Sequence, residues 1–253
     1  MSRFIDLSAP IAPSPAETPA FQRTEVTYLD HAAGAAEIAE LFGVPAALLR
    51  AGEGWTRETI VLGTHNSTHV DAPYHYNSVV AGKPAATIET LPLERFFGPG
   101  VVVDFTDRAD GEAVDVDDLT RELDRIGHVL APGDIVLVRT GRDARYRDPE
   151  YINLGPGVTG AATQWMYDQG IRVMGIDAWG WDRPLYMQAR EAIEQQRTGI
   201  FWQAHQMNLD YSQIERLVNL DQLPSTGFTV ACFPLPIVGA SAAPARVVAI
   251  LPD

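Results

Sequence analysis

The sequence predicts an α/β fold: a single domain with a mixed central β-sheet and surrounding helices. Three observations predict this class. Short β-rich runs alternate with helical patterns along the chain. The composition, 46% hydrophobic and 21% charged over 253 residues, is that of a globular protein able to bury a large core. No Ser/Gly-rich or charged linker divides the chain, so we expect one domain over residues 1–253.

The first fifty residues are expected to contribute little to that core. Residues 1–30 include Pro10, Pro13, Pro15 and Pro19, which favours an extended or irregular N-terminal arm that lies over a neighbouring subunit. Residues 32–49 are rich in Ala, Leu and Glu and have helical potential. Because Gly34 and Pro45 interrupt this stretch, we expect two short helices there.

The remaining chain alternates between predicted strands and helices. Strands are expected at residues 101–105, 134–138, 171–176, 228–233 and 246–251, each preceded by turn-forming or polar residues. Helices are expected at residues 116–126, 159–168, 190–197 and 211–218. The helix at 116–126 carries Asp117 and Asp118 in its first turn, where the helix dipole favours acids. Short, hairpin-like spacing near both ends of the chain favours a mixed sheet over a purely parallel one.

Charge and cysteine usage narrow the function classes. The net charge of −14 disfavours binding to nucleic acid or to an anionic membrane surface. The only cysteine, Cys232, lies in an apolar run and is expected to be a buried core residue. The N-terminus lacks the apolar region of a signal peptide, and no apolar run reaches the ~20 residues that span a bilayer. We therefore expect a cytoplasmic protein.

One segment concentrates metal-binding side chains. Three of the six histidines, His65, His69 and His75, fall within eleven residues together with Asp71. One helix would separate them onto two faces, and one straight strand would place His65 ~13 Å from His69. A turn through Asn66 and Ser67 followed by a strand places His69 and Asp71 on one face and brings His65 back toward them. Two imidazoles and a carboxylate form an open catalytic metal site that leaves a position for water.

This segment resembles the motif H-x-G-T-H-x-D-x-P-x-H of the cyclase family, which includes bacterial kynurenine formamidase and isatin hydrolase. The one departure is Ser67 in place of Gly, which changes the freedom of the turn but removes no ligand. The resemblance continues along nearly the whole chain. Further matching stretches are Asp6-Leu7-Ser8, Arg139-Thr140-Gly141, Gly175-Ile176-Asp177, the E-x-x-x-N-L-x-x-L-P stretch from Glu215 to Pro224, Pro234 to Ile237 and Pro244 to Ile250.

The resemblance implies the cyclase-family fold and assigns roles to the site residues. It implies that His65, His69 and Asp71 bind the first metal ion and that His75 is the catalytic acid/base. It also implies that His205 and Glu215 help to hold a second ion bridged by Asp71, or serve water and substrate where only one ion binds. The cofactor expected is a divalent metal, Zn²⁺ first and Mn²⁺ as the alternative, at one or two ions per chain. Homo-oligomers, a dimer or a tetramer, are usual in this family.

Residues 177–190 depart from the kynurenine formamidases. The bulky Trp179 and Trp181 stand where smaller residues are expected. They are candidates, with Asp177, for the wall of an aromatic or apolar substrate pocket. Core packing or a subunit interface explains the two indoles equally well, so the substrate is less determined than the reaction.

These residues favour a metal-dependent hydrolase that cleaves the C–N bond of a small amide, formamide or lactam. In that reaction His75 supplies the proton that the leaving group needs, and Glu215 activates or orients water if it is not a ligand. A metal-dependent lactonase or esterase is the nearest alternative, followed by a lyase or cyclase acting on a natural-product intermediate. A non-catalytic metal- or ligand-binding protein would retain the ligands but have no use for His75. A purely structural homo-oligomer would leave the histidine cluster without a purpose.

Overall fold

The structure is a computed structural model that describes residues 2–252. These residues form two compact units: residues 2–10 with 67–252, and residues 11–66. The first unit contains a sheet of nine strands in the order β1-β15-β13-β7-β9-β11-β12-β4-β14. The strands are β1 Arg3–Asp6, β4 His69–Asp71, β7 Phe97–Asp104, β9 Ile135–Arg139, β11 Val173–Ile176, β12 Ser212–Glu215, β13 Phe228–Ala231, β14 Ala242–Pro244 and β15 Val248–Leu251.

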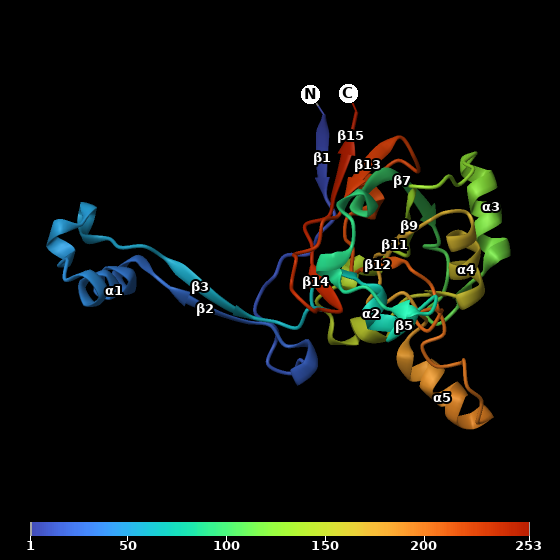
Figure 1. Ribbon diagram of the computed structural model, residues 1–253, viewed down its shortest axis with the longest axis horizontal. Helices are drawn as coiled ribbons and strands as arrows, with labels where there is room; N and C mark the ends of the chain where they lie inside the picture. The colour runs from blue at the N-terminus through green and yellow to red at the C-terminus, as the bar shows by residue number, and fades with distance from the viewer. Residues whose placement is uncertain (1, 253) are drawn as a thin grey trace. The chain divides into compact units, whose positions relative to one another are not determined.

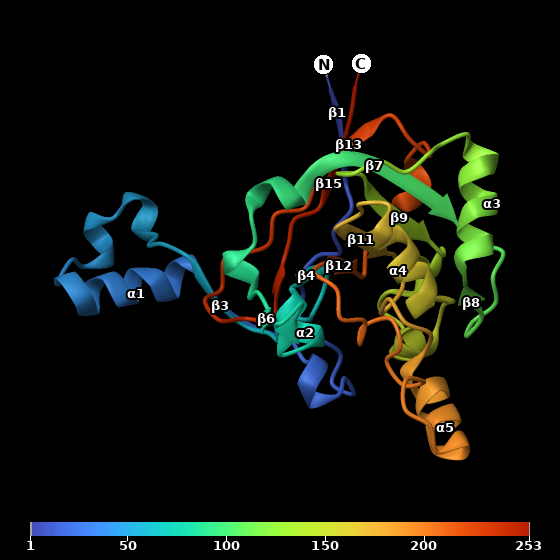
Figure 2. The same ribbon diagram turned by 45° about the vertical axis from the view of Figure 1, so that its right-hand side comes forward.

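The sheet is mixed, as the sequence predicts. Its centre, β7-β9-β11-β12, is parallel, and the strands on both sides of that centre pair antiparallel. Strands β1 and β15 come from opposite ends of the chain and lie side by side as an antiparallel pair (Figure 1). Figure 2 shows β7 as the long strand that crosses the sheet between β13 and β9. The predicted α/β class with a mixed central sheet is therefore confirmed.

The two faces of the sheet carry two hydrophobic clusters, because successive side chains of a strand point to opposite faces. Val101 and Val103 of β7 pack in one cluster, beneath the helices α3 (Val116–Ile126) and α4 (Gly160–Asp168). Val102 packs in the other cluster, with residues of β1, β13 and β15. The parallel central strands are buried on both faces, which explains their continuous apolar sequences.

Shorter elements complete the first unit. They are the helices α2 Pro73–Tyr76 and α5 Leu185–Gln195, and the two-stranded pairs β5 Val79–Val80 with β6 Lys83–Pro84 and β8 Ala113–Val114 with β10 Gly157–Val158. Helix α3 begins with a capping box formed by Asp115 and Asp118 and ends at Gly127 in the left-handed conformation. Short 3-10 helices occur at Ile88–Thr90, Leu93–Phe96, Arg142–Arg145, Pro149–Asn153 and Leu220–Gln222.

The second unit is a two-stranded ribbon with helical segments. Strand β2 (Glu25–Leu29) pairs antiparallel with β3 (Arg57–Val61), and helix α1 spans His31–Phe42. Short 3-10 helices occur at Ala20–Gln22, Ala46–Leu48 and Arg50–Gly52. We expected Gly34 to interrupt this helix, but it lies inside α1. A Cβ at this position would come 1.8 Å from the backbone oxygen of Trp55, so only glycine allows the helix to approach Trp55 this closely.

Residues 1–30, expected to be extended or irregular, contain the strands β1 and β2. Two other expectations need correction. Residues 211–218 form strand β12 and the turn after it, not a helix. The helix expected at 190–197 begins earlier, at Leu185, directly after Pro184. No helix among the described residues is long and apolar enough to cross a membrane.

Candidate metal centre

The histidine-rich motif folds as a turn followed by a strand, as its spacing predicts. Ser67 has a φ of 59°, in the left-handed region that favours glycine, which explains why the family motif has Gly at this position. The Ser67 hydroxyl donates a hydrogen bond to the backbone oxygen of Ala9 at 3.0 Å. Strand β4 starts two residues later, at His69.

His69 and Asp71 project from the same face of β4, two residues apart, and both are fully buried. Val70 between them points to the other face and packs in the hydrophobic cluster there. The strand is held on both sides, by β12 and by β14, so its backbone is fixed. The Nε2 atom of His69 lies 3.3 Å from Oδ1 of Asp71.

Glu215 reaches the same place from the neighbouring strand. It ends β12 and is the direct antiparallel partner of His69, so the two side chains project to one face. Its Oε2 lies 3.6 Å from Nε2 of His69. Each of His69, Asp71 and Glu215 offers one possible ligand atom, and these three atoms lie within 4.8 Å of one another. All three residues are buried.

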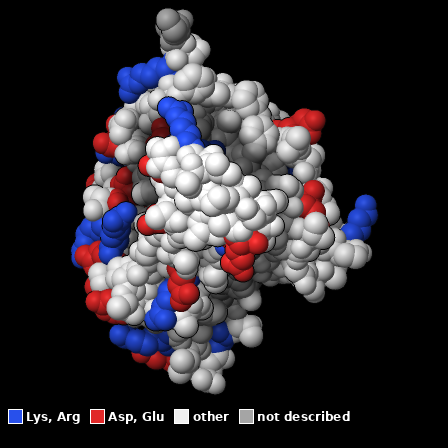
Figure 3. Space-filling view, turned by 90° about the vertical axis from the view of Figure 1, so that its left-hand side faces the viewer, with Lys and Arg blue, Asp and Glu red and all other residues white. Residues whose placement is uncertain are grey.

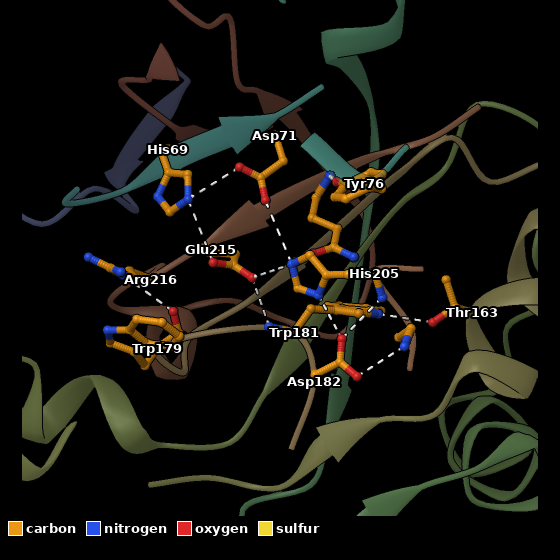
Figure 4. A network of polar contacts seen from close by, with 12 residues as sticks. His69, Asp71, Tyr76, Thr163, Trp179, Trp181, Asp182, His205, Glu215 and Arg216 are labelled. Atoms are coloured by element: carbon orange, nitrogen blue, oxygen red, sulfur yellow. Dashed lines mark hydrogen bonds and ion pairs between the residues drawn. The ribbon is translucent and has the colours of Figure 1, made fainter. Parts of the chain in front are cut away.

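His205 adds a second imidazole on the far side of the two carboxylates. Its Nε2 lies 3.4 Å from Oε1 of Glu215 and 3.9 Å from Oδ2 of Asp71. Figure 4 shows Asp71 and Glu215 between the two imidazole rings, each with one oxygen toward His69 and the other toward His205. The carboxylates therefore have the arrangement expected of groups that bridge two positions.

The two imidazoles are held in the same way. Nδ1 of His69 donates to the backbone oxygen of Ser67 at 2.9 Å, and Nδ1 of His205 donates to Asp182 at 2.6 Å. A carbonyl or carboxylate oxygen accepts only, so each Nδ1 carries a proton and each Nε2 faces the carboxylates. Bonds of this kind orient histidine ligands in metal sites.

The electrostatics of the site are dominated by burial of like charges. Burial is the largest single effect and raises the pKa of Glu215, and the Asp71 charge adds to this; the hydrogen bond from His205 and the charges of His205 and His69 together leave the pKa below its usual value. Burial by itself would lower the pKa of His205, but its bonds to Asp182 and Glu215 raise the pKa to about 10. The negative charges around His205 thus favour its protonated form, and a divalent ion bound to Nε2 of His205 would take the place of the imidazolium proton.

The donor set fits a divalent cation. Two imidazole nitrogens and two carboxylates face one another, and His69, Asp71, His205 and Glu215 are all buried. Nitrogen and oxygen donors of this kind suit Zn²⁺ and related ions. Two adjacent buried carboxylates would repel one another strongly without a compensating charge.

The other motif histidines lie beside this cluster in the sequence. His75 belongs to α2, which Pro73 begins directly after β4, and it is half-buried. Its ring centroid lies 5.7 Å from that of His205, edge to face. His65 belongs to residues 11–66, where it follows β3 and is half-buried.

The expected pocket residues have three different surroundings. Trp181 is fully buried in the hydrophobic core, and its indole N–H donates to Thr163 at 3.0 Å. Asp177 is also buried, and its carboxylate accepts from Thr140 and Gly141, which joins the R-T-G and G-I-D segments. Burial raises the pKa of Asp177 to about 6 against these bonds. Trp179 is half-buried against the guanidinium of Arg216.

The sequence does not predict two residues that contact the site, Asp182 and Trp202. Asp182 is buried and bonded to His205; its only signal is a carboxylate directly after the aromatic pair at 179–181. The Trp202 ring stacks on His205 at 4.7 Å and meets His75 edge to face at 5.0 Å. Its φ of 59° is rare for a bulky side chain. No sequence pattern predicts that conformation.

Comparison with known proteins agrees with this geometry. The Cyclase family model matches residues 5–183. The isatin hydrolase of Roseibium aggregatum is 28% identical over 208 residues, which cover 76% of this chain and 74% of the relative. The kynurenine formamidase of Geobacillus thermodenitrificans is 28% identical over 189 residues, which cover 74% of this chain and 76% of the relative.

A solved structure extends the comparison to the fold. Isatin hydrolase A from Ralstonia solanacearum superposes with a TM-score of 0.77 at 24% identity, over 99% of this chain and 92% of that one. The fold is thus shared along the whole chain, and the resemblance stated from the motif is confirmed. Because the matching family model spans well over half of the sequence and includes the His65–His75 motif, this chain belongs to the cyclase family.

Proposed function

We propose that this protein is a metal-dependent hydrolase that cleaves the C–N bond of a small amide, formamide or lactam. The observation that carries the proposal is the convergence of His69, Asp71 and Glu215 within 4.8 Å in a buried cluster. Relatives named isatin hydrolase and kynurenine formamidase support the same reaction class, since a lactam and a formamide are both C–N substrates.

The ligands we propose divide between two ions that share Asp71. A first ion would be held by His65, His69 and Asp71, and a second, where it binds, by Asp71, His205 and Glu215. The support for two positions is that the two oxygens of Asp71 face different imidazoles, at 3.3 Å and 3.9 Å. Zn²⁺ suits these nitrogen and oxygen donors best, and Mn²⁺ is the alternative.

The residues around the ions supply the remaining chemistry. A divalent cation held there would polarise a carbonyl group and make water a stronger acid. We assign His75 the transfer of a proton from an imidazole nitrogen to the leaving amine; it is half-buried on α2, and its ring meets that of His205 edge to face. Trp202 contacts His75 edge to face, with the two ring centroids 5.0 Å apart.

Elemental analysis with a hydrolysis assay tests this function. Purified wild type is expected to contain one or two ions of zinc or manganese per chain and to hydrolyse isatin or an N-formylated aromatic amine. Asp71→Ala should lose both properties, and the exposed Asp124→Ala should lose neither. No metal after reconstitution with either ion, or full turnover in Asp71→Ala, would contradict the proposal.

We also propose that the protein is a homo-oligomer and that residues 11–66 form part of its interface. A 56-residue unit with little core of its own exposes many large apolar side chains: Ile11, Phe21, Tyr28, Leu41, Phe42, Leu48, Trp55, Ile60 and Val61. Such apolar exposure on a two-stranded ribbon requires a partner. The face drawn in Figure 3 is mostly uncharged, with acids and bases scattered over it.

Light scattering during size-exclusion chromatography tests the assembly. A dimer or tetramer is expected for the wild type, and Phe42→Asp with Leu48→Asp should shift it toward the monomer. The matched surface change Val129→Asp, on the first unit, should not. A monomeric wild type would exclude the assembly. The cytoplasmic location expected from the sequence stays a prediction for cell fractionation.

A further inference from the structure

His205 differs from the other proposed ligands in how its backbone is held. His69, Asp71 and Glu215 lie on strands that are paired on both sides. His205 lies in a run of turns from 198 to 207, between α5 and β12, with no strand partner. A metal ligand on such a segment needs another source of precision, since loops position side chains less exactly than paired strands.

Asp182 provides three hydrogen bonds to this segment. Its Oδ1 accepts from the backbone N–H of Ala204 at 3.0 Å, and its Oδ2 accepts from the backbone N–H of His205 at 3.1 Å. The same Oδ2 accepts from Nδ1 of the His205 ring at 2.6 Å. One carboxylate, 4% exposed, therefore holds both the backbone and the ring of this histidine.

The ring bond decides which nitrogen faces the ion position. With Nδ1 bonded to Asp182, Nε2 is on the opposite edge of the ring and points toward Glu215 and Asp71 (Figure 4). A carboxylate accepts only, so it stabilises the tautomer with the proton on Nδ1. It also makes the imidazole a stronger donor to a cation.

Trp181 fixes Asp182 itself. Its indole is buried in the core and bonded to Thr163, and its backbone oxygen accepts from Val158 at 2.9 Å. Its backbone N–H donates to Oε1 of Glu215 at 2.9 Å. Two consecutive residues thus hold two different ligands: Trp181 holds Glu215, and Asp182 holds His205.

We propose that Asp182 is the positioning residue for His205 and that Trp181 and Asp182 together build the second cation position. The inference rests on the proposed function, because it assumes that His205 binds an ion. It predicts that removing the Asp182 carboxylate weakens binding at the His205 end of the site by about 10- to 100-fold, the effect usual for loss of a carboxylate behind a histidine ligand. Binding at the His69 end should be little affected.

Titration of the metal-free protein with Zn²⁺ alone, followed by calorimetry, tests this. The wild type is expected to show two binding events, and His205→Ala identifies the event that depends on His205. Asp182→Ala should weaken that event about 10- to 100-fold. Asp182→Asn, which retains one acceptor oxygen and nearly the same shape, should weaken it less. The control is Asp134→Ala, because Asp134 accepts from another histidine, His128, at 2.9 Å outside this cluster.

Nitrogen NMR of the His205 ring gives a readout that needs no metal. In the wild type the Nδ1–H proton of His205 should be seen as a slowly exchanging signal because it is bonded to Asp182; Asp182→Ala should lose that signal, while the Nδ1–H of His69, bonded to Ser67, keeps its own. Unchanged Zn²⁺ affinity in both Asp182 variants, or an unchanged His205 ring signal, would overturn the inference. Should Asp182→Ala not fold, Asp182→Asn decides by the same two measurements.

The two proposals fail in different ways. A wild type that binds no Zn²⁺ at all would remove the proposed function and this inference with it. Two wild-type binding events that Asp182→Ala and Asp182→Asn both leave unchanged would remove only the positioning role of Asp182. A single event that survives His205→Ala would leave a one-ion hydrolase without the second position.

Discussion

Glu215 lies directly opposite His69 in the antiparallel pair of β12 and β4, with Oε2 of the glutamate 3.6 Å from Nε2 of the histidine. Because residues paired in this way project to the same face, the ladder itself brings together two groups from distant parts of the chain. Both backbones are held by strands on either side. Strand pairing therefore fixes the two backbones that carry these side chains, which reduces the reorganisation that binding requires.

Replacing His69 by Ala should abolish metal binding and turnover together. The side chain is fully buried and contributes Nε2 to the cluster with Asp71 and Glu215. Metal per chain and the initial rate of hydrolysis are to be measured on the same preparation. His128→Ala, at a histidine outside the cluster, is the matched control and should retain both. Retained metal in His69→Ala would remove His69 from the ligand set.

His75→Ala should keep the metal and lose most of the turnover. The residue is half-buried on α2, beside His205 and Trp202, and we assign it proton transfer to the leaving group. Loss of a general acid typically costs 10²- to 10⁴-fold in rate. Turnover number and metal content separate this role from ligation. Full turnover on a true substrate would show that the acid is another group.

Removing the metal should lower the melting temperature. Asp71 and Glu215 are buried side by side, so a bound cation stabilises the folded state by neutralising them. An ion present at 100 times its dissociation constant adds about 2.7 kcal/mol, which is roughly 5 to 10 °C for a chain of this size. Calorimetry with and without a chelator measures the shift. Asp71→Ala should melt at the same temperature in both conditions.

Gly157→Ala should destabilise the protein by about 1 to 3 kcal/mol, the usual cost of overpacking. A Cβ at Gly157 would come 1.9 Å from the backbone nitrogen of Arg183, so the segment that carries Asp182 must move. Urea unfolding measures the loss of stability. Gly63→Ala is the control, since its Cβ would meet only the Asn66 side chain at 3.5 Å, an ordinary contact. Equal stability of the two variants would contradict the close packing at Gly157.

Local sequence signals predicted the elements that depend on local chemistry. Helix α3 matches the predicted residues 116–126 because Asp115 and Asp118 cap its start and Gly127 ends it. Strand β9 begins one residue after its predicted start, following the turn at Pro132 and Gly133. Such signals operate within a few residues, so they survive whatever the rest of the chain does.

The prediction of a helix at 211–218 was wrong, because local signals do not determine the structure of this segment. A short segment with mixed polar and apolar residues fits a helix or a strand about equally well by its pattern. Tertiary pairing decides: residues 212–215 lie between β11 and β4, and all four are buried. The error matters, because a solvated helix would have made Glu215 an ordinary surface acid, whereas the strand places it opposite His69.

The sequence by itself determined the α/β class, the family, and the turn and strand that place His69 and Asp71 on one face, because these features depend on spacing within one short segment. Only the tertiary structure decided that Trp181 packs in the core while Trp179 does not, and that Asp182 holds His205. Those contacts join segments that are distant along the chain. Strand pairing and burial create them, and neither leaves a signature at the residues themselves.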